Sequence, residues 1–144
     1  MRVLVQRSSP ASVIVSDKVV GKIDFGLVLF VGFTDGDDLN KIDYMINKIL
    51  NLRIFPDENN VMNKSILDVG GSILSISQFT LYGDCSKGNR PSYVKALSTD
   101  QARVLYDEFN NRLSAYIKIE TGIFGADMNV SINNIGPTTI WLER

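Results

Sequence analysis

Runs in which apolar and polar residues alternate dominate the first third of the chain. Residues 2–7 and 11–16 alternate with a period of two, which predicts two half-buried strands that meet near Pro10. Residues 18–23 continue this pattern, and the nearly continuous apolar run 25–33 predicts a buried strand. The N-terminal part of the chain is therefore predicted to be built of strands.

Two later stretches change to the helical period of about 3.6 residues. The first follows the acidic helix caps offered by residues 34–38, and the second begins at Ser98, with Gln101 three positions on as a capping box. Each stretch predicts an amphipathic helix with one face on the core. The two apolar stripes are Leu39, Ile42, Met45, Ile46 and Ile49, and Ala102, Leu105, Tyr106, Phe109, Leu113 and Tyr116.

The remaining segments alternate between strands and connections rich in turn-forming residues. Residues 52–55 predict a short strand, and residues 59–68 predict a polar connection. Because no repeat or linker divides the chain, we expect residues 1–144 to form a single α+β domain, a curled, mostly antiparallel β-sheet or barrel covered by two helices. Its further strands are predicted at residues 73–82, 118–124, 129–133 and 138–142.

The composition excludes several kinds of catalytic site. The chain has no histidine and one cysteine, Cys85, so it can form neither a Ser-His-Asp triad, nor a Cys-His pair, nor a zinc site of histidines or thiolates. We therefore predict that no metal or other cofactor is required. Proton transfer near neutral pH would then come from carboxylates, Lys, Tyr, a hydroxyl or the substrate itself.

Charge and hydropathy limit the partners. The net charge of −1 indicates that any contact with nucleic acid is small and local, since proteins that grip long nucleic acids carry a strong basic excess. The longest apolar stretch, residues 27–33, is far shorter than the roughly 18 residues needed to span a membrane. The start of the chain also lacks a signal-peptide core, so we expect a cytoplasmic protein without a membrane partner.

Polar side chains near the end of the predicted strand 73–82 form the first candidate site. Successive residues of a strand point to opposite faces. A buried strand whose hydroxyls bond to nearby backbone is the simpler interpretation, but strand ends that run into loops are also common places for binding sites. One face carries Gln78, Thr80 and Tyr82, and the other carries Ser75, Ser77 and Phe79.

Three further segments contain groups that suit a binding site. Residues 87–95 form a loop whose cations could hold one or two phosphates, residues 121–128 place two glycines around an aromatic residue, and Gly136-Pro137 stands between two predicted strands. Taken singly, these segments are explained more simply by a solvated loop, a bulged core strand and a turn. The candidate phosphate contacts are Lys87, Arg90 and Lys95.

Considered together, these segments resemble the D-aminoacyl-tRNA deacylase family. The family signature Ser-Gln-Phe-Thr-Leu occurs at residues 77–81, and Asn-x-Gly-Pro-x-Thr occurs at residues 134–139. One departure is Ser8, where the family pattern has an apolar residue. The opening strand 1–7, the loop 87–92 and the segment 121–128 also match, in the family's order and spacing.

The resemblance implies an editing hydrolase that cleaves the ester between a D-amino acid and tRNA. It implies a homodimer in which Gly136 and Pro137 of one subunit enter the pocket of the other, in the cis form, and reject L-amino acids. Glycine would pass the same filter, so glycyl-tRNA mischarged on tRNA(Ala) is a second expected substrate. The strand end that starts at Ser77 would lie beside the ester and the terminal adenosine of the tRNA. The substrate pocket would further include Phe124, Gly125, Ala126 and Met128.

The absence of histidine bears on the mechanism that the resemblance implies. Thr80 is the family's natural nucleophile candidate, but a threonine hydroxyl needs an activating base, and no lysine or carboxylate adjoins it in the sequence. We therefore predict substrate-assisted hydrolysis with help from the 2′-hydroxyl of the terminal adenosine. Backbone N–H groups near Phe79 and Thr80 would stabilise the oxyanion, and the side chains of Gln78 and Thr80 would position the ester or water.

Two other functions stay open from the sequence. A non-catalytic RNA- or protein-binding β-module would explain the lack of familiar catalytic residues, but it predicts a broader basic surface than a net charge of −1 provides. A purely structural homodimer would explain the apolar stripes, but it gives no reason for Gln78 and Thr80 beside a basic loop.

Overall fold

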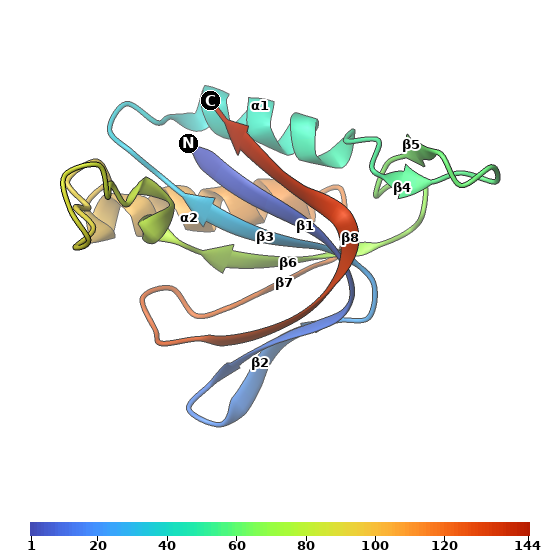
Figure 1. Ribbon diagram of the computed structural model, residues 1–144, viewed down its shortest axis with the longest axis horizontal. Helices are drawn as coiled ribbons and strands as arrows, with labels where there is room; N and C mark the ends of the chain where they lie inside the picture. The colour runs from blue at the N-terminus through green and yellow to red at the C-terminus, as the bar shows by residue number, and fades with distance from the viewer.

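A six-stranded sheet forms the centre of the computed structural model, which describes residues 1–144 (Figure 1). Five of the strands follow the order β2-β1-β3-β6-β7, and β8 runs along β1. The strands are β1 (Arg2–Val15), β2 (Lys18–Ile23), β3 (Gly26–Gly32), β6 (Ser72–Ser77), β7 (Ile119–Thr121) and β8 (Asn129–Glu143).

The long strand β1 organises the sheet. Its first half, residues 2–8, pairs antiparallel with β3, its second half pairs antiparallel with β2, and β8 is antiparallel to both halves. The strands β3, β6 and β7 are mutually parallel. The sheet is therefore mixed, with more antiparallel than parallel pairs, and its curl brings β2 against β7 so that it nearly closes. The predicted curled, mostly antiparallel sheet is confirmed.

Two helices cover the sheet, as predicted: α1 (Leu39–Leu50) and α2 (Thr99–Ser114) (Figure 1). The side chain of Asp38 caps α1 by accepting a hydrogen bond from a backbone N–H of the first turn at 2.9 Å. At the start of α2 the Ser98 hydroxyl donates instead to the side chain of Gln101, at 2.8 Å. Neither helix is long and apolar enough to cross a membrane.

The helices and the sheet enclose the main apolar core. In β3, Leu27 and Leu29 belong to this core, whereas Val28 belongs to a smaller cluster on the other face, inside the curl of the sheet. Burial of both faces explains why β3 is apolar without alternation. Most of the predicted helical stripes are buried here, but Leu39 and Tyr116, at the ends of the stripes, are exposed.

Two predicted breaks between strands are wrong. Strand β1 is continuous through Pro10, and β8 is continuous through Gly136-Pro137. Both prolines lie where the register between β1 and β8 shifts, so neither removes a hydrogen bond from a regular ladder. The Gly136-Pro137 segment is therefore a bulge in an edge strand and not a turn between two strands.

Other element boundaries also differ from the prediction. The predicted strand 73–82 ends at Ser77, and its last residues form the 3-10 helix η1 (Phe79–Tyr82), because the neighbouring strand β3 ends at Gly32. The strand predicted at 118–124 is shortened to β7. The strand predicted at 52–55 is reduced to β4 (Phe55–Pro56), and the connection 59–68 contains its partner β5 (Met62–Lys64).

Candidate active site

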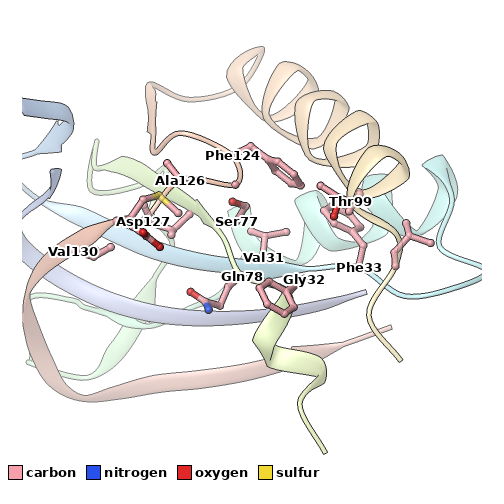
Figure 2. A pocket seen from close by; sticks show the side chains of 16 residues that line it. Val31, Gly32, Phe33, Ser77, Gln78, Thr99, Phe124, Ala126, Asp127 and Val130 are labelled. Carbon is pink, nitrogen blue, oxygen red and sulfur yellow. The ribbon is translucent and has the colours of Figure 1, made fainter. Parts of the chain in front are cut away.

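A cavity of about 540 Å³ opens at the carboxyl ends of β3 and β6 (Figure 2). Helix α2 forms one wall through Thr99 and Ala102, and the connection between β7 and β8 forms another. A cavity of this volume is in the range of small-molecule sites, and its lining is mostly apolar with a few polar groups, as such sites usually are.

Seven of the predicted site residues meet in this cavity. Ser77, Gln78 and Phe79 lie where β6 ends and η1 begins, and the others come from the segment 124–128 before β8. These segments are more than 40 positions apart in the sequence, so the fold brings together two motifs that were found separately. The four residues from the second segment are Phe124, Gly125, Ala126 and Met128.

Some lining residues had not been predicted. Asp127 lies inside the segment 121–128, but its carboxylate carried no signal that set it apart from other acidic residues. Thr99 and Ala102 belong to a helix whose pattern indicated only a core stripe. Gly32 is required by packing, because a Cβ atom there would lie 2.8 Å from the carbonyl oxygen of Gln78. Its role depends on this close approach of two segments, which the sequence does not reveal.

Thr80 lies beside the cavity on η1 and is exposed. Its hydroxyl accepts a hydrogen bond from the side-chain amide of Gln78 at 2.5 Å, and it has no other side-chain partner. An amide is not a base, so nothing in the chain is placed to take a proton from this hydroxyl. The geometry supports a positioning role for Thr80 more than a nucleophilic one.

Two neighbouring backbone amides are free at the start of η1. The N–H of Gln78 makes the last bond to the sheet, to the carbonyl of Val31 at 2.7 Å. The N–H groups of Phe79 and Thr80 donate no hydrogen bond within the chain, as is usual for the first residues of a helical turn. Two adjacent free donors beside a cavity can bind a developing negative oxygen.

Arg2 anchors η1 to the sheet. One guanidinium nitrogen donates to the carbonyl of Leu81 at 2.8 Å, and another pairs with Glu143 at 2.8 Å. The guanidinium also lies over the rings of Tyr82 and Trp141, 4.3 and 5.3 Å from their centroids. Burial raises the pKa of the Tyr82 phenol well above its ordinary value, so this ring stays neutral at every physiological pH.

Tyr106 of α2 packs behind Phe124 and supports this part of the cavity wall. The Tyr106 hydroxyl donates to the carbonyl of Ser75 at 2.8 Å, and the Tyr106 ring lies 5.7 Å from that of Phe124. Burial raises the pKa of Tyr106, which therefore stays a neutral donor. Gly122 leaves room for Met128, because a Cβ atom on Gly122 would collide with the Met128 sulfur.

The three predicted phosphate contacts lie on one loop beside the cavity mouth. Lys87 and Arg90 are exposed and form no ion pair, whereas the Lys95 ammonium lies 3.4 Å from a carboxylate oxygen of Asp84. Hydrogen bonds from Ser86, together with Lys95, lower the pKa of Asp84 to about 2. Tyr93 of the same loop packs edge-to-face on Phe79, with ring centroids 5.0 Å apart, so the loop contacts the lip of the cavity.

Gly136 and Pro137 lie outside this cavity. The peptide bond between them is cis, and both residues are exposed. The Gly136 carbonyl accepts a hydrogen bond from Arg7 at 3.4 Å, and Arg7 also donates to the carbonyl of Ile54 at 2.6 Å. A Cβ atom on Gly136 would meet nothing within 4 Å, so packing inside the chain does not require a glycine here.

No group of three or more Cys, Asp or Glu side chains is placed to hold a metal ion. Cys85 is exposed and unpaired in the loop. The prediction that catalysis needs no metal therefore stays a prediction that an assay must test.

Comparisons with known proteins agree with the resemblance found in the motifs. The family model described as D-Tyr-tRNA(Tyr) deacylase matches residues 4–143. A D-aminoacyl-tRNA deacylase of Anoxybacillus flavithermus is 52% identical over 144 residues, which cover 99% of each chain. One of Bacillus cytotoxicus is 54% identical with the same coverage.

Solved structures show the same fold. The structure named c-Myc DNA Unwinding Element Binding Protein has a TM-score of 0.94 and 39% identity, and the match covers 100% of this chain and 99% of the other. A probable eukaryotic D-amino acid tRNA deacylase has a TM-score of 0.82, covering 98% and 97%. Its identity is 20%, so that likeness concerns the fold alone.

Proposed function

The chain belongs to the D-Tyr-tRNA(Tyr) deacylase family, and we propose that it hydrolyses the ester of D-aminoacyl-tRNA in the cavity between η1 and Phe124. Its relatives carry the name of this ester hydrolase. The observation that carries the proposed site is that the free N–H groups of Phe79 and Thr80 stand beside a cavity of about 540 Å³ lined by residues 77–79 and 124–128.

The proposed chemistry uses backbone more than side chains. The ester carbonyl oxygen would accept hydrogen bonds from the N–H groups of Phe79 and Thr80 as it becomes an oxyanion, and such a donor is worth about 2.7–4 kcal/mol. Water would attack the carbonyl carbon, and the bond from that carbon to the 3′-oxygen of the terminal adenosine would break. The 2′-hydroxyl would relay a proton from the water to the departing 3′-oxygen, which leaves as a hydroxyl and frees the D-amino acid. The hydrogen-bonded side chains of Gln78 and Thr80 would orient the ester or the water.

The rest of the cavity suits the terminal adenosine. Phe124 and Met128 offer an apolar wall for the base, and the Ser77 hydroxyl offers a polar group near the ribose. Lys87, Arg90 and Lys95 on the neighbouring loop would contact phosphates of the acceptor strand. Lys95 would have to contact a phosphate while it stays paired with the Asp84 carboxylate. A substrate of this kind fits the predicted cytoplasmic location, which cell fractionation would check.

Selection against L-amino acids is proposed to come from a second copy of the chain. Gly136 and Pro137 are exposed, and the open space at Gly136 would be filled by a partner's substrate. The carbonyl of Gly136, held by Arg7, would stand where an L side chain must pass. A steric obstacle to one configuration is a simpler filter than recognition of many different D side chains. Glycine would not meet this obstacle.

The experiment compares hydrolysis of D-tyrosyl-, L-tyrosyl- and glycyl-tRNA by the wild-type protein in EDTA. We expect the D and glycyl esters to be cleaved and the L ester to be spared about a thousandfold, which corresponds to roughly 4 kcal/mol. Failure to cleave any ester would contradict the proposed activity. Activity that returns only with a divalent cation would contradict the metal-free mechanism.

A further inference from the structure

An unpaired arginine stands at the rim of the cavity. Arg103 lies on α2 and is exposed, and its guanidinium carbon is 4.8 Å from the centroid of the Phe124 ring. One of its terminal nitrogens lies 3.9 Å from the point that a Cβ atom on Gly125 would occupy. Arg103 therefore lies over Phe124 and next to Gly125, two consecutive residues of the cavity wall.

No acceptor in the chain uses this guanidinium. Arg103 makes no salt bridge, although Asp100 and Asp107 lie three and four positions away on the same helix. By contrast, Arg112 on α2 is held by Asp43 at 2.7 Å and Glu108 at 2.6 Å. The guanidinium lies over the Phe124 ring, and its N–H groups stay free to donate.

We propose that Arg103 binds the 5′-phosphate of the terminal adenosine when that nucleotide occupies the cavity. This rests on the proposed function, which puts the base against Phe124 and Met128 and the ester beside Phe79 and Thr80. The phosphate must then leave the cavity along its rim. Within the cavity the Asp127 carboxylate would repel the phosphate. At the rim, Arg103 is the cation that lies against the Phe124 wall.

An arginine suits this task for a chemical reason. Its planar guanidinium can donate two parallel hydrogen bonds to a phosphate, and because it already lies over an aromatic ring it loses less freedom on binding than a mobile lysine. One such contact is also compatible with a net charge of −1, which leaves no broad basic surface to hold the backbone.

The test measures binding separately from hydrolysis. Two ligands are compared by calorimetry: D-tyrosyl-3′-amino-3′-deoxyadenosine, whose amide link resists cleavage, and the same compound with a 5′-phosphate. The proteins are wild type, Arg103→Gln, Arg103→Lys and Lys48→Gln. Lys48 is the matched control, since it lies over the ring of Tyr44 on α1, away from the cavity, and its substitution removes the same charge.

In the wild type we expect the phosphate to tighten binding about tenfold. Arg103→Gln should lose this gain, Arg103→Lys should keep part of it, and Lys48→Gln should keep all of it. The phosphate-dependent gain in the wild type should also weaken as salt is raised, as expected for one ionic contact.

Two results would overturn the proposal: a wild type that binds both ligands equally, or an Arg103→Gln variant that keeps the full gain. The phosphate-free ligand shows in each variant whether the cavity has kept its shape. Hydrolysis of D-tyrosyl-tRNA by the wild type is measured in parallel. A protein that cleaves the ester but ignores the phosphate would refute the role of Arg103 and leave the proposed function intact.

Discussion

Thr80 is the residue that decides between a covalent and a substrate-assisted mechanism. Its hydroxyl contacts only Gln78, while the backbone N–H of the same residue is free. Thr80→Ala keeps the N–H and removes the hydroxyl, so we expect kcat for D-tyrosyl-tRNA to fall only about threefold to tenfold. Single-turnover hydrolysis measures this loss.

A second substrate completes this test of Thr80. D-Tyrosyl-tRNA ending in 2′-deoxyadenosine should resist the wild-type protein, because the assisting hydroxyl is missing. Trapping of an aminoacyl group on Thr80, or loss of nearly all activity in Thr80→Ala, would reverse the assignment.

Two glycines near the proposed chemistry are expected to respond differently to alanine. A methyl group on Gly136 meets nothing within 4 Å in the chain, whereas one on Gly32 lies 2.8 Å from the Gln78 carbonyl oxygen. Gly136→Ala should therefore unfold at the wild-type temperature, but its activity should fall about tenfold or more because the methyl group would enter the proposed partner's site. Gly32→Ala should lose both activity and about 1–3 kcal/mol of stability.

Thermal unfolding and D-tyrosyl-tRNA hydrolysis, measured on the same samples, separate these two glycine variants. Full activity in Gly136→Ala would mean that this glycine has no role at an interface.

At the scale of elements, the sequence predicted the helices and strands whose apolar residues recur with a regular period. The stripes of α1 and α2 and the buried run of β3 arise from residues that all face one core, and each appears where predicted. It did not predict that β6 changes to η1 after Ser77, since residues 77–82 keep a strand-like alternation. The change is caused by contacts outside the segment. Because β3 ends, β6 loses its pairing partner, and Arg2 donates a hydrogen bond to the carbonyl of Leu81.

The proposed site was predictable to a similar extent and for a similar reason. Its motifs could be recognised locally, so Gln78 and Phe124 were found. Gly32 and Arg103 act through contacts with distant segments, and no local pattern marks them. Gly136-Pro137 was read locally as a turn, although the long register shift between β1 and β8 makes it a bulge.

The anchoring of η1 by Arg2 gives a test at this scale. Arg2→Met keeps an apolar side chain between Tyr82 and Trp141 but removes the bond to Leu81 and the pair with Glu143. We expect a loss of about 1–2 kcal/mol of stability, because a charged hydrogen bond and a partly exposed cation–π contact are lost. The kcat should fall about tenfold as the free amides lose their fixed position, with a smaller change in KM.

Arg2→Lys is the control for charge at this position. It keeps the cation, and we expect it to recover part of the kcat. A variant Arg2→Met that is destabilised but has an unchanged kcat would show that η1 holds its position without Arg2.

At the scale of the whole molecule, the distribution of charge fits a protein that reads only the end of its nucleic acid. The net charge is −1, and the unpaired cations nearest the cavity, Lys87, Arg90 and Arg103, are few. Electrostatic attraction to phosphates alone would give weak, salt-sensitive binding. Selectivity would then come from the cavity, whose volume of about 540 Å³ is in the range of small-molecule sites.

The arrangement of the two motifs within one chain leads to the prediction that the site is shared between subunits. The cavity motif and the exposed Gly136-Pro137 do not meet in a single chain, so a site that contains both, as proposed, would need a second copy, most simply related by two-fold symmetry. Sedimentation at micromolar concentration should then give twice the chain mass of 16.0 kDa. A stable, active monomer would contradict this assembly.

Mixed dimers test the sharing of sites directly. Gly136→Ala has an intact cavity, and Ala126→Trp fills the cavity but keeps Gly136 and Pro137 intact, so each homodimer should keep at most about a tenth of the wild-type activity. In a mixed dimer, one site combines both defects and the other combines none. When equal amounts of the two variants are refolded together, half of the dimers should be mixed. Because one of the two sites in each mixed dimer is intact, about a quarter of the wild-type activity should return. If each chain completed its own site, both variants would stay inactive in every combination and mixing would restore nothing.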